Sequence, residues 1–247
     1  MSRLFIPKDY WEQIVPNYIS ESKVNDILQY YDNEYGKGGL TPAKNDVFKA
    51  LELTSFKDVR VVILGQDPYP DLKNAMGLAF SSKSEIRPLS LGNIIKEVEN
   101  EYSCSKGFHG NDLSYWANQG VLLLNAILTF KKSDKKSENN FYKRNGKRWE
   151  DITDAIICSL DDYSEKKKVP IVFMLWGEDA CFTACRTLLL KSNKYRLVLT
   201  ATHPSNKSKS KDRDFAKKFE GCGHFRKANA FLAKNKVNEI DWGIYTY

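Results

Sequence analysis

Apolar residues along the chain gather into four short runs, each followed by a polar or glycine-containing turn. The runs cover residues 60–64, 120–125, 170–176 and 195–201 and are rich in Val, Ile and Leu. Continuous runs of this length predict strands that are buried on both faces, as in a parallel sheet. The segments between these runs have apolar residues at the spacing typical of helices. The pattern therefore favours an α/β fold, a single domain with a central four-stranded parallel twisted sheet flanked by helices.

The helices are predicted from apolar spacing and from residues that begin or end a helix. We expect a helical lead-in over residues 1–43 and a core over about 44–242. Within the core, helices are expected over 44–53, 90–102, 149–160, from 179 onward, and over 225–234. Ser90 is expected to cap one of them, because a serine side chain can accept a hydrogen bond from an amino-terminal N–H.

Each predicted strand ends near a residue with useful chemistry. The four ends lead to Asp67, Asn125, the turn at 177–178, and His203. Parallel strands present their carboxyl ends at one edge of a sheet, where open α/β folds bind ligands. Taken singly, these residues are more often ordinary turn, cap or loop residues, and Phe80 is more often core. Together, an acid, an amide and an imidazole in one pocket suit hydrolysis and the reading of a base.

Composition and charge limit the classes of protein to which this chain could belong. The chain has 247 residues, of which 42% are hydrophobic and 13% aromatic, enough for a packed core. Its net charge of +7 suits a polyanionic partner. No apolar run predicts a membrane span and the amino terminus does not look like a leader, so a cytoplasmic protein is expected, or a nuclear one in a eukaryotic or viral host. The five cysteines form no C-x-x-C pair, and no metal site is predicted.

Six short motifs in a fixed order resemble a known family. They are GQDPY at 65–69, GLAFS at 77–81, GVLLLNAILT at 120–129, LWG at 175–177, HPS at 203–205 and GCGHF at 221–225. The set resembles the family 1 uracil-DNA glycosylases. The resemblance implies a monofunctional hydrolase that flips uracil out of single- or double-stranded DNA and cleaves its N-glycosidic bond. The product would be an abasic site for base excision repair, and no cofactor or metal would be needed.

The resemblance also implies a role for each motif residue. Asp67 would stabilise a cationic sugar or orient the attacking water, and His203 would donate a hydrogen bond to O2 of the departing uracil. Tyr69 would exclude the methyl group of thymine, and Phe80 would stack on the uracil ring. Asn125 would read O4 and N3–H of uracil. The sequence leaves open whether His203 acts as a neutral imidazole or as an imidazolium.

Contacts with DNA are expected from short loops. The backbone of Gln66 would help to fix the base, and Ser90 and Ser205 match family serines that contact phosphates beside the flipped nucleotide. Lys207 stands where the family has a wedging leucine, in a loop that is longer than usual, so we expect a moderate preference for single strands. The basic segment 131–148, with eight basic and two acidic residues, is expected to be mainly solvated surface.

Two further positions depart from the family pattern. Pro70 replaces the usual histidine after GQDPY, and Glu178 replaces a serine after LWG. These changes affect expected water or phosphate contacts and leave the reaction type unaltered. Besides uracil-containing DNA, a proteinaceous glycosylase inhibitor is an expected partner. The chain is expected to be a monomer.

Three alternative functions were weighed. The first is a DNA-binding accessory module without activity, which would have no need for both Asp67 and His203. The second is a glycosylase of broader base range, which Tyr69 argues against because its ring would block a 5-methyl group. The third is an unrelated cysteine or serine hydrolase, for which the sequence has no recognisable nucleophile motif.

Overall fold

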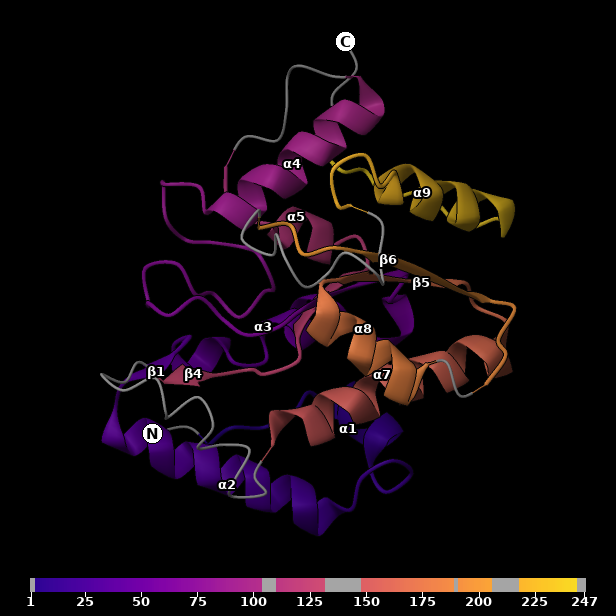
Figure 1. Cartoon of the computed structure of the whole chain (residues 1–247). Helices are drawn as coiled ribbons and strands as arrows, with labels where there is room; N and C mark the ends of the chain where they lie inside the picture. The colour runs from indigo at the N-terminus through magenta and orange to yellow at the C-terminus, as the bar shows by residue number, and fades with distance from the viewer. Residues whose placement is uncertain (1–2, 104–109, 132–147, 189–190, 206–217, 244–247) are drawn as a thin grey trace.

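The centre of the molecule is one parallel sheet of four strands in the order β3-β2-β5-β6 (Figure 1). This computed structural model describes residues 3–103, 110–131, 148–188, 191–205 and 218–243. The strands are β2 (Val61–Gly65), β3 (Val121–Asn125), β5 (Ile171–Trp176) and β6 (Arg196–Ala201). All residues of β2, β3 and β5 are buried, as the continuous apolar runs predicted. The predicted fold class is confirmed, and each strand lies within one residue of its predicted bounds.

Helices cover both faces of the sheet (Figure 1). The helices are α1 (Lys8–Ile14), α2 (Glu21–Lys37), α3 (Lys49–Leu53), α4 (Leu89–Tyr102), α5 (Ser114–Ala117), α7 (Trp149–Lys167), α8 (Glu178–Thr187) and α9 (His224–Lys234). One layer holds α4, α5 and α9, and the other holds α1, α2, α7 and α8. No helix in the described ranges is both long enough and apolar enough to cross a lipid bilayer.

The helix expected over 44–53 is divided in two. Lys44–Asp46 forms a 3₁₀ turn, and α3 begins only at Lys49. Between them Phe48 leaves the helical conformation, with φ −103° and ψ 17°. Its buried side chain packs edge-on against Trp149, with the ring centroids 5.9 Å apart. Tertiary packing of one aromatic side chain thus overrides the helical spacing of the segment.

The prediction that Ser90 caps a helix is wrong. Helix α4 begins one residue earlier, at Leu89, and Pro88 occupies the cap position without a side-chain hydrogen bond. Ser90 is the second residue inside the helix. The proline explains the start, because its fixed φ suits the entry to a helix and the preceding backbone must be extended.

Two further differences concern short or polar segments. A two-stranded antiparallel ribbon, β1 (Leu40–Thr41) with β4 (Phe130–Lys131), was not predicted. The helix expected to end at residue 160 runs on to Lys167, and two polar residues of the added turns, Asp161 and Ser164, are buried. One of these, Ser164, donates a hydrogen bond to the carbonyl of Val169 at 2.7 Å.

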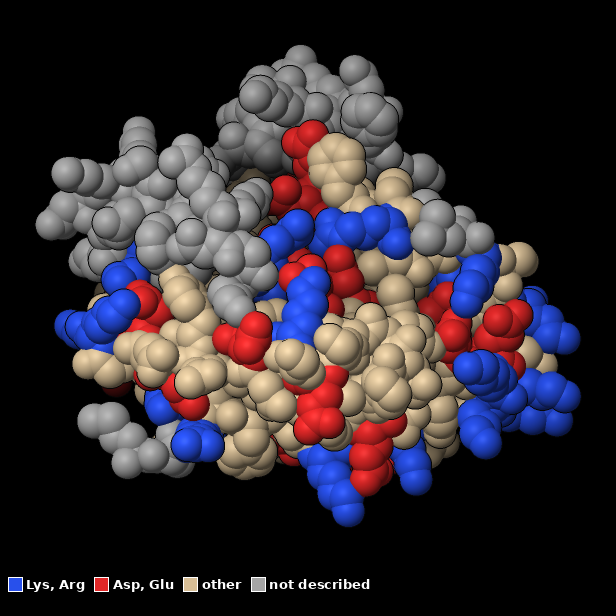
Figure 2. Space-filling model, turned by 90° about the horizontal axis from the view of Figure 1, so that it is seen from below, with Lys and Arg blue, Asp and Glu red and all other residues tan. Residues whose placement is uncertain are grey.

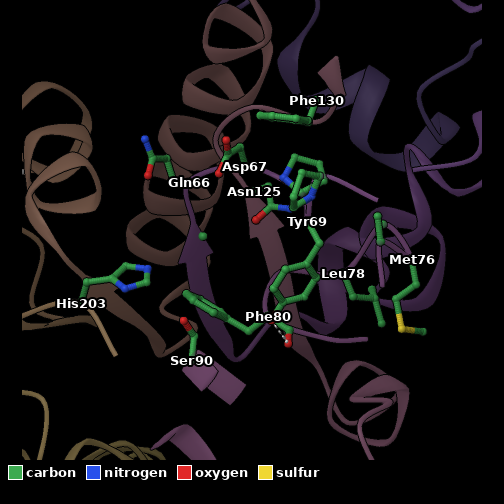
Figure 3. A pocket seen from close by; sticks show the side chains of 15 residues that line it. Gln66, Asp67, Tyr69, Met76, Leu78, Phe80, Ser90, Asn125, Phe130 and His203 are labelled. Atoms are coloured by element: carbon green, nitrogen blue, oxygen red, sulfur yellow. Dashed lines mark hydrogen bonds between the residues drawn. The ribbon is translucent and has the colours of Figure 1, made fainter. Parts of the chain in front are cut away.

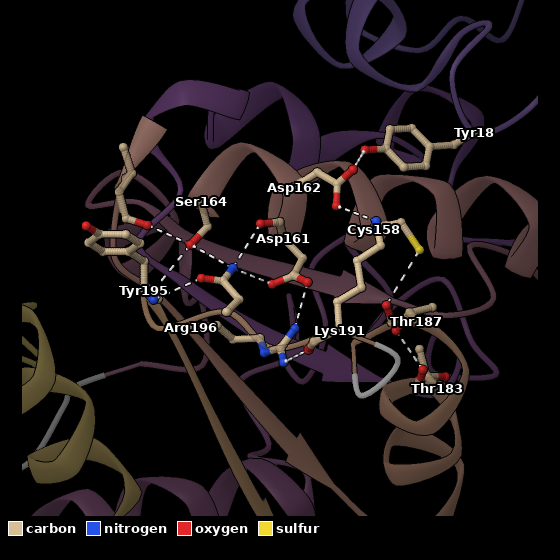
Figure 4. Close-up of polar contacts among 12 residues, drawn as sticks. Tyr18, Cys158, Asp161, Asp162, Ser164, Thr183, Thr187, Lys191, Tyr195 and Arg196 are labelled. Atoms are coloured by element: carbon tan, nitrogen blue, oxygen red, sulfur yellow. Dashed lines mark hydrogen bonds and ion pairs between the residues drawn. The ribbon is translucent and has the colours of Figure 1, made fainter. Parts of the chain in front are cut away.

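A buried ion pair attaches the first residue of β6 to α7 (Figure 4). The Arg196 guanidinium donates to a carboxylate oxygen of Asp161 at 2.6 Å, and the two side chains are only 8% and 6% exposed. Asn193 donates to the other oxygen of Asp161 at 2.8 Å. Because each buried charge has its partner and further hydrogen bonds, the pair fixes the start of β6, whose far end leads into the residues around His203.

Candidate active site

A pocket of about 270 Å³ lies at the carboxyl edge of the sheet (Figure 3). It is lined by Gly65, Gln66, Asp67, Pro68, Tyr69, Pro70, Ala75, Met76, Gly77, Leu78, Phe80, Ser90, Asn125, Phe130 and His203. Seven of the nine site residues predicted from the sequence are therefore in this pocket. Ser205 lies beside His203, as described below, and Lys207 falls outside the described residues.

Asn125 ends β3 and lies directly against the neighbouring strand. Its side chain is buried, at 7% exposed, and Gly65 of β2 is its partner in the sheet register. A Cβ atom at Gly65 would lie 2.2 Å from Oδ1 of Asn125, closer than atoms approach one another. The missing side chain of Gly65 therefore leaves the space that the amide occupies. This fixes the orientation of a group that both donates and accepts hydrogen bonds.

The turn that carries Asp67 is bonded to the residues that follow β3. Ala126 N–H donates to the carbonyl of Gly65, and Ile127 N–H donates to that of Gln66, both at 2.9 Å. The pKa of Asp67 is raised to about 6, mainly because surrounding protein displaces water from the carboxylate and also because Asp179 adds negative charge. A carboxylate with this pKa is ionised at neutral pH and protonated in mild acid.

Tyr69 and Phe80 form one wall of the pocket. The Tyr69 hydroxyl donates to the carbonyl of Phe80 at 3.1 Å, and burial raises the pKa of Tyr69 to about 12, which keeps the phenol neutral. Phe80 has φ +63°, an unusual value for a residue with a large side chain, so the surrounding contacts must hold it there. Its ring lies 5.6 Å from that of Trp176 and 6.0 Å from that of His203. The wall is rigid and aromatic.

The loop after β6 determines which nitrogen of His203 carries a proton. The Ser205 backbone N–H donates to Nδ1 of His203 at 3.0 Å, and the Ser205 hydroxyl is 2.8 Å from the same nitrogen. Because a backbone N–H can only donate, Nδ1 must accept, and the proton of the ring belongs on Nε2. The question that the sequence left open is thus answered in favour of a neutral imidazole with an Nε2–H donor. In Figure 3 His203 and Phe80 lie across the pocket from Asp67.

Two residues outside the pocket hold His203 in place. Asn93 of α4 donates to the carbonyl of Pro204 at 2.6 Å, which ties the loop to a helix in the layer above. Gly177, at the end of β5, has φ +98°, and a Cβ there would lie 3.1 Å from Cβ of His203. The end of β5 therefore packs against His203. The turn at 177–178 was expected to contribute to the pocket, but neither of its residues is among those that line it.

Several pocket residues were not identified from the sequence. Met76 and Leu78 come from the loop after the GQDPY motif, and Phe130 comes from β4. None follows a parallel strand, so the strand-end argument could not find them. Asp179 was assigned only as the start of a helix, and the role of Asn93 depends on a contact between residues 111 positions apart.

The histidine of the GCGHF motif has a structural role. The Trp176 indole N–H donates to Nδ1 of the buried His224 at 3.0 Å, and burial lowers the pKa of His224 to about 4. It is therefore neutral and packed in the core. Among the described residues, Glu97, Glu101 and Cys222 lie close enough to hold a metal ion. However, Glu97 accepts the Gly221 N–H at 2.8 Å, and Glu101 accepts N–H groups from the first turn of α9. These carboxylates cap a helix.

Known proteins resemble this chain in sequence and in fold. Residues 52–233 match the model of the family described as the uracil DNA glycosylase superfamily. The chain is 37% identical to a uracil-DNA glycosylase of Aliarcobacter butzleri, covering 94% of this chain and 99% of the relative. It is 40% identical to one of Ralstonia pickettii, covering 96% and 85%. The crystal structure of mimivirus uracil-DNA glycosylase matches with a TM-score of 0.78 at 23% identity, covering 96% of this chain and 87% of that one. A mimivirus variant in complex with UGI matches with a TM-score of 0.77.

Proposed function

The chain belongs to the uracil-DNA glycosylase superfamily, and we propose that the pocket described above is where it excises uracil from DNA. The reaction is a hydrolysis: uracil leaves C1′ of deoxyribose with the electron pair of the glycosidic bond, and water adds to C1′. The DNA strand stays intact and carries an abasic site. One observation carries the assignment of the pocket. An acid, a fixed amide and an imidazole with a defined donor, each from a different strand end, line the same cavity of about 270 Å³.

Recognition of uracil is assigned to Asn125, Tyr69 and Phe80. The amide of Asn125 donates to O4 and accepts from N3–H of uracil, whereas cytosine presents the reverse pair and would leave both groups unpaired. The Tyr69 ring, held by its bond to the Phe80 carbonyl, occupies the space that a thymine methyl group would need. The ring of Phe80 supplies a flat face for stacking. The Gln66 backbone, held to Ile127, borders the base.

Bond cleavage is assigned to His203 and Asp67. As the bond breaks, negative charge grows on O2 of uracil, and Nε2–H of His203 donates to it. A neutral donor keeps its proton, so uracil leaves as an anion stabilised by a hydrogen bond. Positive charge develops on the sugar, and the ionised carboxylate of Asp67 stabilises it and orients the water. The proton released by that water passes to Asp67 or to solvent.

Contacts with the DNA backbone are assigned to the loops around the pocket. Ser90 is the second residue of α4, whose first turn carries no acidic residue, and such a helix end attracts phosphate. A phosphate on the hydroxyl of Ser205 would lie next to the ring that this hydroxyl touches, His203. Among the described residues on the face shown in Figure 2, Lys and Arg are interspersed with Asp and Glu. Lys207 remains a proposed contact outside the described residues.

Four finer assignments are proposals. The GQDPY and HPS motifs support membership of family 1 within the superfamily. A monomer is proposed because one strand edge and one pocket suffice for this chemistry. A proteinaceous inhibitor is a proposed partner because a structural neighbour, a mimivirus variant, is solved in complex with UGI. The protein is proposed to work in the cytoplasm, or in the nucleus of a eukaryotic or viral host.

The experiment that tests this function uses matched oligonucleotides with one U, one T or one C, in single-stranded and duplex form. They are incubated with the protein in the presence of chelator and then treated with hot alkali, which cuts at abasic sites. Asp67→Asn and His203→Ala are tested alongside Glu12→Gln, which changes an exposed acid on α1. We expect scission at U alone, largely lost in the first two variants and retained in the third.

Other results would reject the assignment. Uncut DNA everywhere, with binding retained, would identify a DNA-binding accessory module. Scission at T as well would identify a broader base range and would contradict the role of Tyr69. Full activity in Asp67→Asn would place the chemistry elsewhere.

A further inference from the structure

Thr41 is a buried threonine that contacts the loop carrying Tyr69. It lies in β1 and is only 5% exposed. Its hydroxyl donates to the backbone carbonyl of Tyr69 at 2.9 Å. The carbonyl of Phe130, its partner in the β1–β4 ribbon, lies 3.4 Å from the same hydroxyl. Because a hydroxyl has one proton to donate and the shorter contact is the stronger one, the bond to Tyr69 is the main interaction.

The residues on either side of Tyr69 limit how its backbone can be held. They are Pro68 and Pro70, and a proline has no N–H to donate. The carbonyl of Tyr69 accepts instead from Thr41, 28 positions earlier in the sequence. At the other end of the residue, the Tyr69 hydroxyl donates to the carbonyl of Phe80 at 3.1 Å (Figure 3). Tyr69 is thus held at its backbone by Thr41 and at the tip of its ring by Phe80.

The ribbon that carries Thr41 is itself bonded to helix α2. The hydroxyl of Tyr35 in α2 donates to the carbonyl of Pro42, the residue after Thr41, at 2.9 Å. Across the ribbon, the Lys131 ammonium lies 2.9 Å from a carboxylate oxygen of Glu34, also in α2, whose side chain is only 4% exposed. Both strands of the ribbon are therefore attached to the same helix, and the hydroxyl of Thr41 is held in a fixed position.

We propose that Thr41 is a positioning residue that determines how strictly the pocket rejects pyrimidines with a substituent on C5. This inference rests on the proposed function, in which the ring of Tyr69 occupies the space that a methyl group on C5 would need. A steric clash excludes a competing base only as far as the clashing group resists displacement. The bond from Thr41 resists displacement of the Tyr69 backbone, which rotation of the side chain cannot replace.

The size of the effect follows from the loss of one hydrogen bond. In Thr41→Val the side chain keeps nearly the same shape, and the carbonyl of Tyr69 loses its donor. The net contribution of one hydrogen bond corresponds to about fivefold in an equilibrium or a rate. Uracil has only a hydrogen atom on C5, so it does not press on the ring and its excision should change little. A base with a methyl-sized group does press on the ring, and its excision should become faster.

The test measures kcat/KM on single-stranded oligonucleotides with one uracil or one 5-chlorouracil, from the free base released. Chlorine is similar in size to a methyl group and withdraws electrons, so 5-chlorouracil leaves more readily than thymine. Thr41→Val is compared with Thr41→Ser, which keeps the hydroxyl, and with Thr54→Val. Thr54 is the matched control, because it is buried and its hydroxyl also donates to a backbone carbonyl, that of Ala117, at 2.9 Å. It is not one of the residues that line the pocket.

We expect Thr41→Val to raise the ratio of kcat/KM on 5-chlorouracil to that on uracil about fivefold, with kcat/KM on uracil within about threefold of wild type. Thr41→Ser should keep the wild-type ratio. Thr54→Val should lose a similar amount of stability in thermal unfolding and leave the ratio unchanged.

Three results would overturn the inference. The first is an unchanged ratio in folded Thr41→Val. The second is 5-chlorouracil left uncut by both wild type and Thr41→Val. The third is an equal rise of the ratio in Thr54→Val, which would show that loss of stability anywhere in the fold relaxes the pocket.

A second pair of variants tests whether Thr41 acts through the ring of Tyr69. In Tyr69→Ala the ring is absent, so the addition of Thr41→Val should change the ratio no further. A rise as large as in the wild-type background would place the effect elsewhere and reject the inference. Failure of the proposed function has a different sign, namely that wild type releases no uracil, and the inference then fails with it.

Discussion

Gly65 is the position where one added carbon tests the geometry of the pocket most cleanly. In Gly65→Ala the new Cβ would lie 2.2 Å from Oδ1 of Asn125 and 3.0 Å from Cβ of Ala79. Ordinary contact begins at 3.4 Å, so the amide oxygen must move by about 1 Å. Misplacement of a recognition group by this amount costs on the order of 100-fold in rate. We therefore expect kcat/KM on a uracil oligonucleotide to fall by about two orders of magnitude, close to 2.7 kcal/mol.

The assay measures kcat/KM by alkaline scission, together with circular dichroism and thermal unfolding. Gly36→Ala is the matched control, because no atom lies within 4 Å of its added Cβ. Overpacking at Gly65 should cost about 1 to 3 kcal/mol of stability, which leaves the protein folded at 25 °C. Wild-type kcat/KM in folded Gly65→Ala would refute the role of the fixed Asn125 amide. An equal loss in Gly36→Ala would show that the assay reports stability instead.

Three further predictions concern the acid, the loop and the ion pair. Because the pKa of Asp67 is about 6, its ionised form is lost below that pH, and kcat/KM should fall by about tenfold per pH unit at the acid end of a profile from pH 4.5 to 8. A level profile down to pH 4.5 would contradict this role. Asn93→Ala removes the hydrogen bond that holds Pro204 next to His203, the proposed donor to uracil, so kcat should fall roughly tenfold while the melting temperature changes by only a few degrees. Single-turnover rates test this, and an unchanged kcat counts against it. Arg196→Met leaves the buried Asp161 carboxylate without its cation, so urea unfolding should show a loss of about 3 to 5 kcal/mol. Adding Asp161→Asn should recover part of the loss, and failure to recover any would mean that the charge is not its cause.

Three strands of the sheet could be predicted because β2, β3 and β5 are buried on both faces and therefore appear as unbroken apolar runs. The edge strand β6 is mostly half-buried, and its apolar segment at 197–199 still indicated a strand. The ribbon of β1 and β4 could not be predicted, since each strand has two residues and shows no periodicity. The break before α3 depends on where the ring of Phe48 packs, which is a property of the tertiary structure.

One side of the pocket was also accessible from the sequence. Asp67, Asn125 and His203 each lie at or just after the end of a parallel strand, and the topology brings such positions together. The other side was not accessible, because Met76 and Phe130 reach the pocket through loops and a short ribbon. The detailed geometry of the site, such as the position of protons, could not be predicted from the sequence. The proton on Nε2, for example, follows from one backbone N–H of the loop after β6, and no composition rule predicts it.

The local structure at Ser90 was predicted incorrectly. Its position before a helical pattern suggested a cap, but Pro88 occupies the cap position and Ser90 lies inside the first turn of α4. The residue lines the pocket, and its contact with phosphate stays a prediction.

The measurement that tests the central claim most directly is a single turnover in ¹⁸O-labelled water. A single-stranded oligonucleotide with one uracil is mixed with excess protein, and both products are analysed by mass spectrometry. The account predicts free, unlabelled uracil and an intact strand whose abasic sugar carries one ¹⁸O atom. Release of no uracil, or a strand cut without alkali, would contradict it, as would label in the released base.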